Sequence, residues 1–184
     1  AGAGRASLGN VSRRPSVIDI THITPGNIST FKDVRLRALL DTPSAFGSTY
    51  ARERELSDAE WMRRAMRWNG ERGIGFLAVE GGIGCGIVGS MLDEDDATRA
   101  TLVSMWTAPT HRRRGVARRL VDEVVAWARA RDVAAIRLMV TSNNGPAVAL
   151  YERLGFTNTG RTEPYPNDAS LVEYEMVRRL TVLG

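Results

Sequence analysis

The segment from residue 100 to residue 141 constrains the fold more than any other part of the chain. The β-rich stretch "ATRATLVSMWTA" ends before Pro109, a helical pattern runs from about Arg114 to Arg131, and the apolar stretch "AAIRLMVT" (134–141) follows as a buried strand. Apolar side chains recur along one face of that helix at Val116, Leu120, Val124 and Trp127. Because a strand, helix, strand crossover pairs its strands in parallel and is almost always right-handed, this segment predicts an α/β fold.

The remaining chain adds antiparallel strands on both sides of this crossover. A first strand (16–23) precedes a helix over about residues 28–40, and a Ser57-x-x-Glu60 capping box opens a second helix that ends at Asn69-Gly70. Three β-rich segments between Gly73 and Thr107 predict a meander, and "GPAVALYERLG" predicts a helix before two closing strands. We therefore expect a mixed, mostly antiparallel sheet of six or seven strands flanked by about four helices.

Length and composition favour one domain without membrane segments. The 184 residues are 43% hydrophobic, which suffices for one core over residues 16–184, whereas residues 1–15 read as a flexible lead or a cloning remnant. The single cysteine, Cys85, cannot form an internal disulfide, and no leader or long apolar run is present, so we expect a cytoplasmic protein.

The charge of the chain suits an anionic ligand. The net charge is +4 with a pI near 9.8. Five arginines surround Gly115 in "THRRRGVARR", but the cluster lacks interleaved aromatic residues and a second basic stripe, so we expect no nucleic-acid partner.

The arginine and glycine turn predicts a phosphate site. The first backbone amides of a helix have no partner within the helix, and the helix dipole adds partial positive charge at that end. Gly115 has no Cβ to keep a ligand away, and Ala117 has the smallest. Successive amides after Pro109 can form an anion nest, to which arginine side chains add charge-assisted hydrogen bonds.

These residues resemble the GCN5-related N-acetyltransferase (GNAT) superfamily. Arg112-x-x-Gly115-x-Ala117 is similar to its acyl-CoA signature, and Thr107-Ala108-Pro109 is similar to the V-x-P that precedes it. "NNGPAVALYERLGF" is similar to the second family motif, and "EYEMVRRL" resembles the last strand. The resemblance covers about residues 16–180.

The resemblance implies a fold and a reaction. The sheet would splay between the fourth and fifth strands, and the enzyme would move acetyl from acetyl-CoA to a primary amine of a small molecule or protein by direct attack. It implies coenzyme A as cosubstrate, no metal, and a possible homodimer. A non-catalytic acyl-CoA-binding or regulatory module of the same fold stays open as the alternative.

The resemblance also assigns roles to residues. A backbone amide near Met105 would stabilise the oxyanion, and Tyr151 would be the general acid, since a phenol is protonated at neutral pH. The backbone of Trp106 and Thr107 would pair with the pantetheine arm, and Asn144 would help to hold that arm. The diphosphate would be bound by Arg112, Arg113, Arg114, Gly115, Val116, Ala117 and Arg118.

The general base and the acceptor site remain open in the sequence. Many relatives carry a glutamate near the position of Thr101, and threonine cannot act as that base. Glu53 and Glu55, in the loop before the second helix, could act directly or through water and would suit a cationic amine. Phe46, Tyr50 and Glu53 are the substrate-side candidates.

Structural roles compete with several of these assignments. Arg118 and Arg119 each precede an acid by four residues, Asp122 and Glu123, so helix-surface ion pairs explain them adequately. Tyr151 could be a tyrosine at the core rim, and Asn144 could be only a turn or N-cap residue.

Overall fold

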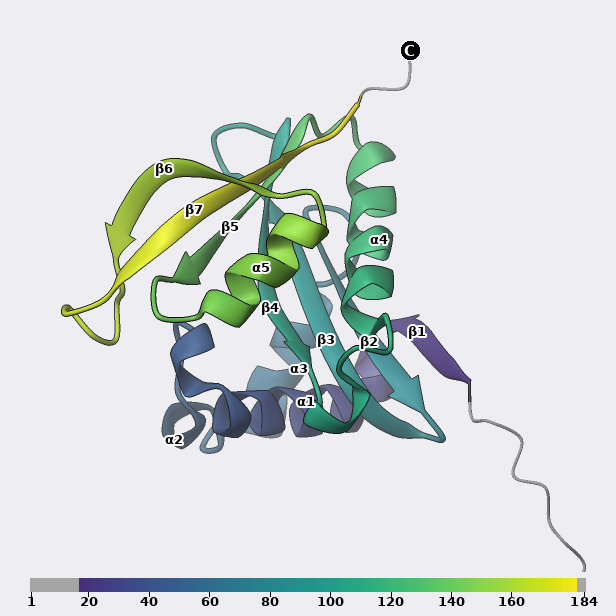
Figure 1. Cartoon of the computed structure of the whole chain (residues 1–184). Helices are drawn as coiled ribbons and strands as arrows, with labels where there is room; N and C mark the ends of the chain where they lie inside the picture. Colours follow the sequence, from purple (N-terminus) through teal and green to yellow (C-terminus); the bar gives the residue numbers. More distant parts are fainter. Residues whose placement is uncertain (1–16, 182–184) are drawn as a thin grey trace, which may run out of the picture.

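The structure, a computed structural model, describes residues 17–181 as one seven-stranded sheet with helices on its two faces (Figure 1). The strand order across the sheet is β1-β2-β3-β4-β5-β7-β6. The strands are β1 (Ile18–His22), β2 (Gly73–Glu80), β3 (Ile83–Leu92), β4 (Arg99–Thr107), β5 (Ala135–Thr141), β6 (Thr157–Pro164) and β7 (Val172–Arg179). All neighbours are antiparallel except β4 and β5, which confirms the mixed, mostly antiparallel sheet.

Five α-helices and three short 3-10 turns connect the strands in the described residues. The helices are α1 (Ile28–Asp41), α2 (Tyr50–Glu53), α3 (Asp58–Met66), α4 (Val116–Arg129) and α5 (Gly145–Arg153). The 3-10 turns are η1 (Pro25–Asn27), η2 (Pro43–Ala45) and η3 (Pro109–His111). None of the helices between residues 17 and 181 has the length and apolar character needed to cross a bilayer.

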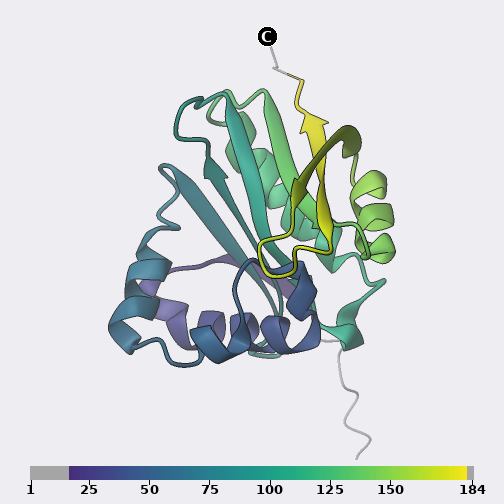
Figure 2. The same ribbon diagram turned by 90° about the vertical axis from the view of Figure 1, so that its left-hand side faces the viewer.

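The sheet separates two helical layers. Figure 2 shows α4 behind the strands and α1 to α3 in front of them. The helix α4 buries its predicted apolar face, with Val116, Leu120 and Val124 at most 1% exposed. Glycines in β3 permit close approach on both sides, because a Cβ at Gly84 would lie 2.2 Å from Val34 of α1 and one at Gly86 would lie 3.1 Å from Leu120 of α4.

Two irregularities in β4 shape the centre of the sheet. Pairing between β4 and β5 is confined to Arg99–Thr101 in the described structure, so the strands diverge beyond that point. On its other edge, β4 shifts register against β3, with Gly89 opposite Val103 but Ile87 opposite Trp106. The predicted splay is therefore present, and a bulge lies beside it.

The structure corrects two element boundaries. Residues 50–53 form the single-turn helix α2, where the sequence predicted a loop, because Thr49 caps the turn by accepting from the amide of Arg52. The helix α4 begins at Val116 rather than near Arg114, because Gly115 at φ 78° is its N-cap. The Ser57 and Glu60 capping box of α3 is confirmed. The interpretation of residues 1–15 lies outside the described residues.

Candidate functional site

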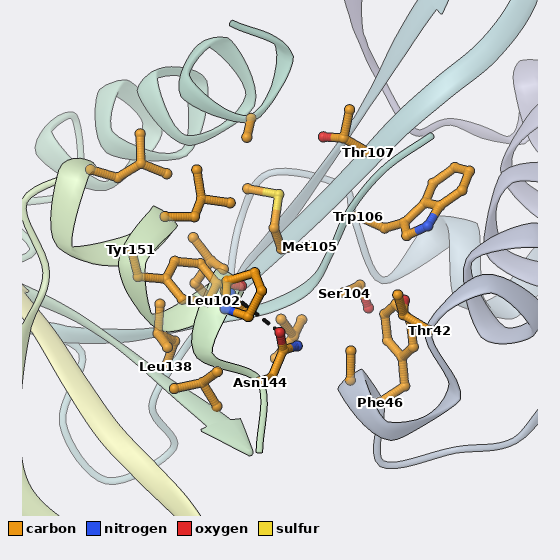
Figure 3. A pocket seen from close by; sticks show the side chains of 18 of the residues that line it. Thr42, Phe46, Leu102, Ser104, Met105, Trp106, Thr107, Leu138, Asn144 and Tyr151 are labelled. Atoms are coloured by element: carbon orange, nitrogen blue, oxygen red, sulfur yellow. Dashed lines mark hydrogen bonds between the residues drawn. The ribbon is translucent and has the colours of Figure 1, made fainter. Parts of the chain in front are cut away.

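A cavity of about 1450 Å³ occupies the opening between the diverging strands. Its walls come from β4, β5, α5, the η3–α4 turn and the segment around η2. Figure 3 shows Tyr151 and Leu138 on one side, Thr42 and Phe46 on the other, and Met105 between them. The cavity therefore joins the predicted phosphate turn to the predicted substrate-side loop.

The β4 bulge lies on the wall of this cavity. Ser104 has a positive φ of 58°, and neither Ser104 nor Met105 has a paired residue in β3 or β5 of the described sheet. A serine in this left-handed conformation is uncommon, and such outliers gather at functional sites. Met105 lines the cavity at this bulge, and the sequence predicted an oxyanion-binding amide near it.

The turn before α4 leaves its amides unpaired. Among the described residues, the amides of residues 113–118 donate to no backbone carbonyl and to no capping side chain. A Cβ at Gly115 would meet no atom within 4 Å, so the space above it is open. This concave set of donors at a helix N-terminus has the chemistry of a phosphate-binding nest.

The arginine side chains of this turn behave differently from one another. The guanidinium of Arg112 binds Asp41 at the end of α1 and donates to the carbonyl of Thr107 at 3.1 Å. The guanidinium of Arg114 is held by Glu80 at 2.6 and 3.1 Å, and Arg114 is not part of the cavity lining. Arg113 is exposed, lines the cavity and forms no hydrogen bond within residues 17–181. Of these three arginines, Arg112 and Arg113 line the cavity, and only the side chain of Arg113 has no partner among the described residues.

The helix-surface explanation of Arg118 and Arg119 is wrong. Neither pairs with the acid four residues on within the described chain; instead Arg118 donates to the carbonyl of Arg153 at 3.3 Å and Arg119 to that of Ile18 at 2.6 Å. These contacts fix α4 to α5 and to β1. Val116, Ala117 and Arg118 all line the cavity.

Tyr151 and Asn144 meet the cavity from α5. Tyr151 is 9% exposed and packs edge-on against Phe156, with 5.8 Å between the ring centres. Its hydroxyl makes no hydrogen bond within the described residues. Burial raises the pKa of the Tyr151 phenol well above its usual value of 10. The side chain of Asn144 accepts from the amide of Ala147 at 3.2 Å, so it is an N-cap that also lines the cavity (Figure 3).

Trp106 and Thr107 follow the bulge on β4. The indole of Trp106 is buried and donates to Asp41 at 2.9 Å. The hydroxyl of Thr107 is buried in the cavity wall and has no partner within the described residues. A buried hydroxyl without a partner favours a polar ligand at this point.

The aromatic substrate-side candidates, Phe46 and Tyr50, and the candidate acid Glu55 lie in three different environments. Phe46 is buried at the cavity wall, and its carbonyl accepts from the Tyr165 hydroxyl at 2.9 Å, which attaches the β6–β7 loop to the η2 segment. Tyr50 begins α2 and is not part of the cavity lining, and the guanidinium carbon of Arg54 lies 5.9 Å from its ring centre. Glu55 is exposed and pairs with Arg54. Sequence reasoning therefore placed Tyr50 and Glu55 too close to the site.

Glu53 is not the free acid that the sequence suggested. It is 1% exposed on α2 and takes both Nε and Nη2 of Arg35, at 3.0 and 2.8 Å, while Arg64 lies 2.9 Å away. Burial works to raise the pKa of Glu53, but the hydrogen bonds and charges of the two arginines outweigh it and hold the pKa below its usual value. A carboxylate so bound is a poor proton acceptor.

Sequence reasoning missed Glu173 on β7. It lines the cavity, and its side-chain carboxylate forms neither a hydrogen bond nor an ion pair with the described residues. Burial, assisted by the facing charge of Glu163 on β6, raises its pKa. Thr101 donates to Asp93 at 2.9 Å and accepts from Arg137, so that position offers no base. No sequence pattern marked Glu173, because β7 reaches the cavity only through the divergence of β4 from β5.

The described residues offer no cluster of metal ligands, and the histidine of the cavity wall is already bonded. Between residues 17 and 181, no group of three or more His, Cys, Asp or Glu side chains could hold a metal ion. His111 lines the cavity, but its Nε2 lies 2.8 Å from Glu80 and its Nδ1 lies 2.8 Å from Thr110.

Known proteins resemble this chain in both sequence and fold. Residues 37–156 match the model of the acetyltransferase (GNAT) family. The [ribosomal protein bS18]-alanine N-acetyltransferase of Escherichia coli K12 is 32% identical over 130 residues, which is 68% of this chain and 82% of that protein. A streptothricin acetyltransferase of Escherichia coli is 34% identical over 82 residues, 39% of this chain and 47% of that protein. The PaiA N-acetyltransferase of Thermoplasma acidophilum, solved with coenzyme A, has the same fold, with a TM-score of 0.71, 15% identity, and coverage of 89% and 99%.

Proposed function

The chain belongs to the acetyltransferase (GNAT) family, and we propose that the cavity between β4 and β5 is where its acetyl donor and its amine acceptor meet. The chain is an N-acetyltransferase, and acetyl-CoA is its cosubstrate. The observation that carries the proposal is that one cavity connects the unpaired amides of residues 113–118 with the bulge at Met105.

The donor half of the cavity fits coenzyme A. The amides of residues 113–118 bind the diphosphate, Gly115 lets it approach the backbone, and the exposed Arg113 adds charge. The diverging edge of β4 at Trp106 and Thr107, with the unpartnered Thr107 hydroxyl, binds the amide-containing pantetheine arm. Asn144 supports the same wall as the cap of α5.

The reaction needs a proton acceptor, an oxyanion donor and help for the leaving sulfur. When bound, acetyl-CoA supplies an acetyl thioester as the electrophile. The amide of Met105 donates to the carbonyl oxygen, and the bulge supports this role because it removes that residue from strand pairing.

Glu173 is the best-supported base for the amine. The cavity wall also contains Glu53, but that carboxylate is bound by Arg35 and Arg64. Glu173 has no such partner in the described residues, and burial raises its pKa towards the range in which a base can hold a proton taken from an ammonium group. Glu173 therefore keeps the amine neutral, directly or through water.

Tyr151 assists the leaving sulfur as a hydrogen-bond donor. Its raised pKa lies far above the value of about 8.5 for an ordinary thiol, so complete proton transfer to sulfur is unfavourable. Its hydroxyl lacks a protein partner among the described residues and is free to donate towards the cavity.

The partners in general are an acyl-CoA donor and an amine acceptor. We propose that nucleic acid is not a partner, because Asp41 and Glu80 already bind Arg112 and Arg114 and reduce the basic patch. The expected homodimer is testable by light scattering. The buried, unpaired Cys85 supports a reducing, cytoplasmic location.

The function is tested by mixing the protein with acetyl-CoA and a panel of primary amines and measuring the release of free thiol. We expect thiol release that depends on the amine, and coenzyme A binding by calorimetry. Absence of coenzyme A binding at high micromolar concentration would contradict the assignment of the cavity.

A further inference from the structure

The acceptor end of the cavity contains two arginines beside one buried carboxylate. Arg35 and Arg64 both line the cavity next to Glu53, while Glu173, the other acid of the lining, lies on β7 and has no ion pair with the described residues. Because Arg35 already occupies both oxygens of Glu53 through a bidentate contact, Arg35 and Glu53 neutralise each other. Arg64 is therefore the cation that remains in excess.

Arg64 retains donors for a ligand. Its Nη1 lies 2.9 Å from Glu53, but its guanidinium forms no hydrogen bond with the described residues. The side chain is 33% exposed, and its guanidinium carbon lies 5.4 Å from the ring centre of Trp61, which supports it from one side. An arginine with unused donors at a cavity wall is suited to bind a carboxylate or a phosphate.

The charged group lies close to the predicted reaction centre. Arg35 donates from Nη1 to Ser104 at 3.2 Å, so the chain of contacts runs from the β4 bulge through Arg35 and Glu53 to Arg64. Arg64 therefore belongs to a group of contacting side chains that begins at the bulge and lines the same cavity.

The surface beyond Arg64 is also basic. A second cavity of about 640 Å³ shares Arg64 with the first and contains three further arginines, Arg52, Arg63 and Arg67. Its acid is Glu60, whose Oε2 accepts from the amide of Ser57 at 2.7 Å as part of the α3 capping box. An anionic group that approaches this surface meets electrostatic attraction beside Arg64.

We propose that the acceptor is a primary amine that also carries an anionic group, a carboxylate or a phosphate, and that Arg64 binds this group. The inference rests on the proposed function and names the substrate class of the same site. It reverses the expectation that Glu53 and Glu55 select a cationic amine, because Glu53 is neutralised and Glu55 points to solvent. The anionic group anchors the acceptor and leaves its nitrogen for Glu173.

The test compares matched amines on the protein saturated with coenzyme A. Calorimetry measures the binding of γ-aminobutyrate, of its uncharged amide, and of phosphoethanolamine beside ethanolamine. We expect the anionic member of at least one pair to bind about 10- to 100-fold more tightly, as charge-assisted hydrogen bonds would give. Which pair shows the larger difference distinguishes a carboxylate from a phosphate.

Substitutions connect this preference to Arg64. Arg64→Gln is expected to remove the preference while leaving the affinity for the uncharged amines unchanged, and Arg64→Lys is expected to retain part of it. Arg54→Gln is the matched control, because Arg54 is exposed and lines neither cavity. Thermal unfolding of each variant shows whether it is folded.

The outcomes separate the two proposals. Equal affinity within both pairs, or no binding of any probe to the protein saturated with coenzyme A, overturns the anionic acceptor. An equal loss for charged and uncharged probes in folded Arg64→Gln overturns it too. Failure to bind coenzyme A at all overturns the proposed function instead.

Discussion

The two ends of the cavity, for which we propose different ligands, are built by different means. The proposed donor end presents backbone groups, with the amides of residues 113–118 and the bulge at Ser104 and Met105. The acceptor end uses side chains that come from separate elements, with Arg35 from α1, Glu53 from α2 and Arg64 from α3. Backbone recognition tolerates many side chains, whereas the acceptor end changes its chemistry with each substitution.

The largest effect is expected from substitution of Glu53 and concerns the stability of the protein. It tests how far the acceptor end depends on this one carboxylate. Glu53→Gln leaves the buried Arg35 without its ionic partner, and we expect a loss of about 3 kcal/mol in unfolding free energy by denaturant titration. Glu55→Gln, at an exposed pair, should change it by less than about 0.5 kcal/mol. Similar losses in both variants would contradict the structural role of Glu53.

The stabilisation that Glu53 provides depends on pH, and the direction of that dependence follows from its pKa. The pKa of Glu53 is lowered in the folded protein, so its stabilisation is complete above its unfolded pKa, near 4.5, and is lost as the pH falls below that value. Wild-type stability should therefore decrease more steeply with acidification than that of Glu53→Gln.

The next effect tests whether the acceptor end supplies the base. Glu173→Gln should lower kcat about 100-fold and remove the acidic limb of the pH profile, while coenzyme A binding is retained. In Glu163→Gln, loss of the facing charge lowers the pKa of Glu173, so the acidic limb should move to lower pH. An unchanged limb in both variants would remove Glu173 from the mechanism.

Gly115 tests the donor end in the same way. Gly115→Val places a side chain above the unpaired amides and should weaken coenzyme A binding about 30-fold by calorimetry. Gly160→Val is the control, since Gly160 on β6 also has a positive φ and open space around it. Both variants should lose similar stability, about 1–2 kcal/mol, because valine is strained at positive φ. Equal coenzyme A binding by the two variants would argue against the phosphate nest.

The smallest effect concerns Tyr151, where the two ends meet. If Tyr151 only donates a hydrogen bond, Tyr151→Phe should lower kcat about 10-fold without changing coenzyme A affinity. Tyr174→Phe on β7, outside the cavity lining, should leave kcat unchanged. A complete loss of turnover in Tyr151→Phe would instead indicate full proton transfer.

The sequence predicted the local backbone features of the proposed donor end, because their signals are local. Gly115, Pro109 and the apolar face of α4 lie within one short stretch, and their backbone consequences follow from steric rules. The splay also followed, through the family resemblance. The exact partners of the arginines did not, since Asp41 and Glu80 are more than 30 residues away from Arg112 and Arg114.

The proposed acceptor end was harder to predict, because its contacts join residues that are distant in the sequence. Whether Glu53 is free or neutralised depends on Arg35 and Arg64, which three separate helices bring together. The single turn α2 replaced the expected loop and buried Glu53 while turning Tyr50 away. Glu173 became a candidate only when the structure placed this β7 residue in the lining of the cavity beside β4.

The divergence of β4 from β5 also bears on strand pairing between copies of the chain. Exposed strand edges at the rim of a sheet invite pairing with other chains, but here the unpaired edge of β4 beyond Thr101 is enclosed by α5 and the η2 segment. An extended molecule with amide groups that lies in the cavity could pair with this edge. The hydrogen-bonding capacity of the edge thus remains available inside the cavity rather than along the rim of the sheet.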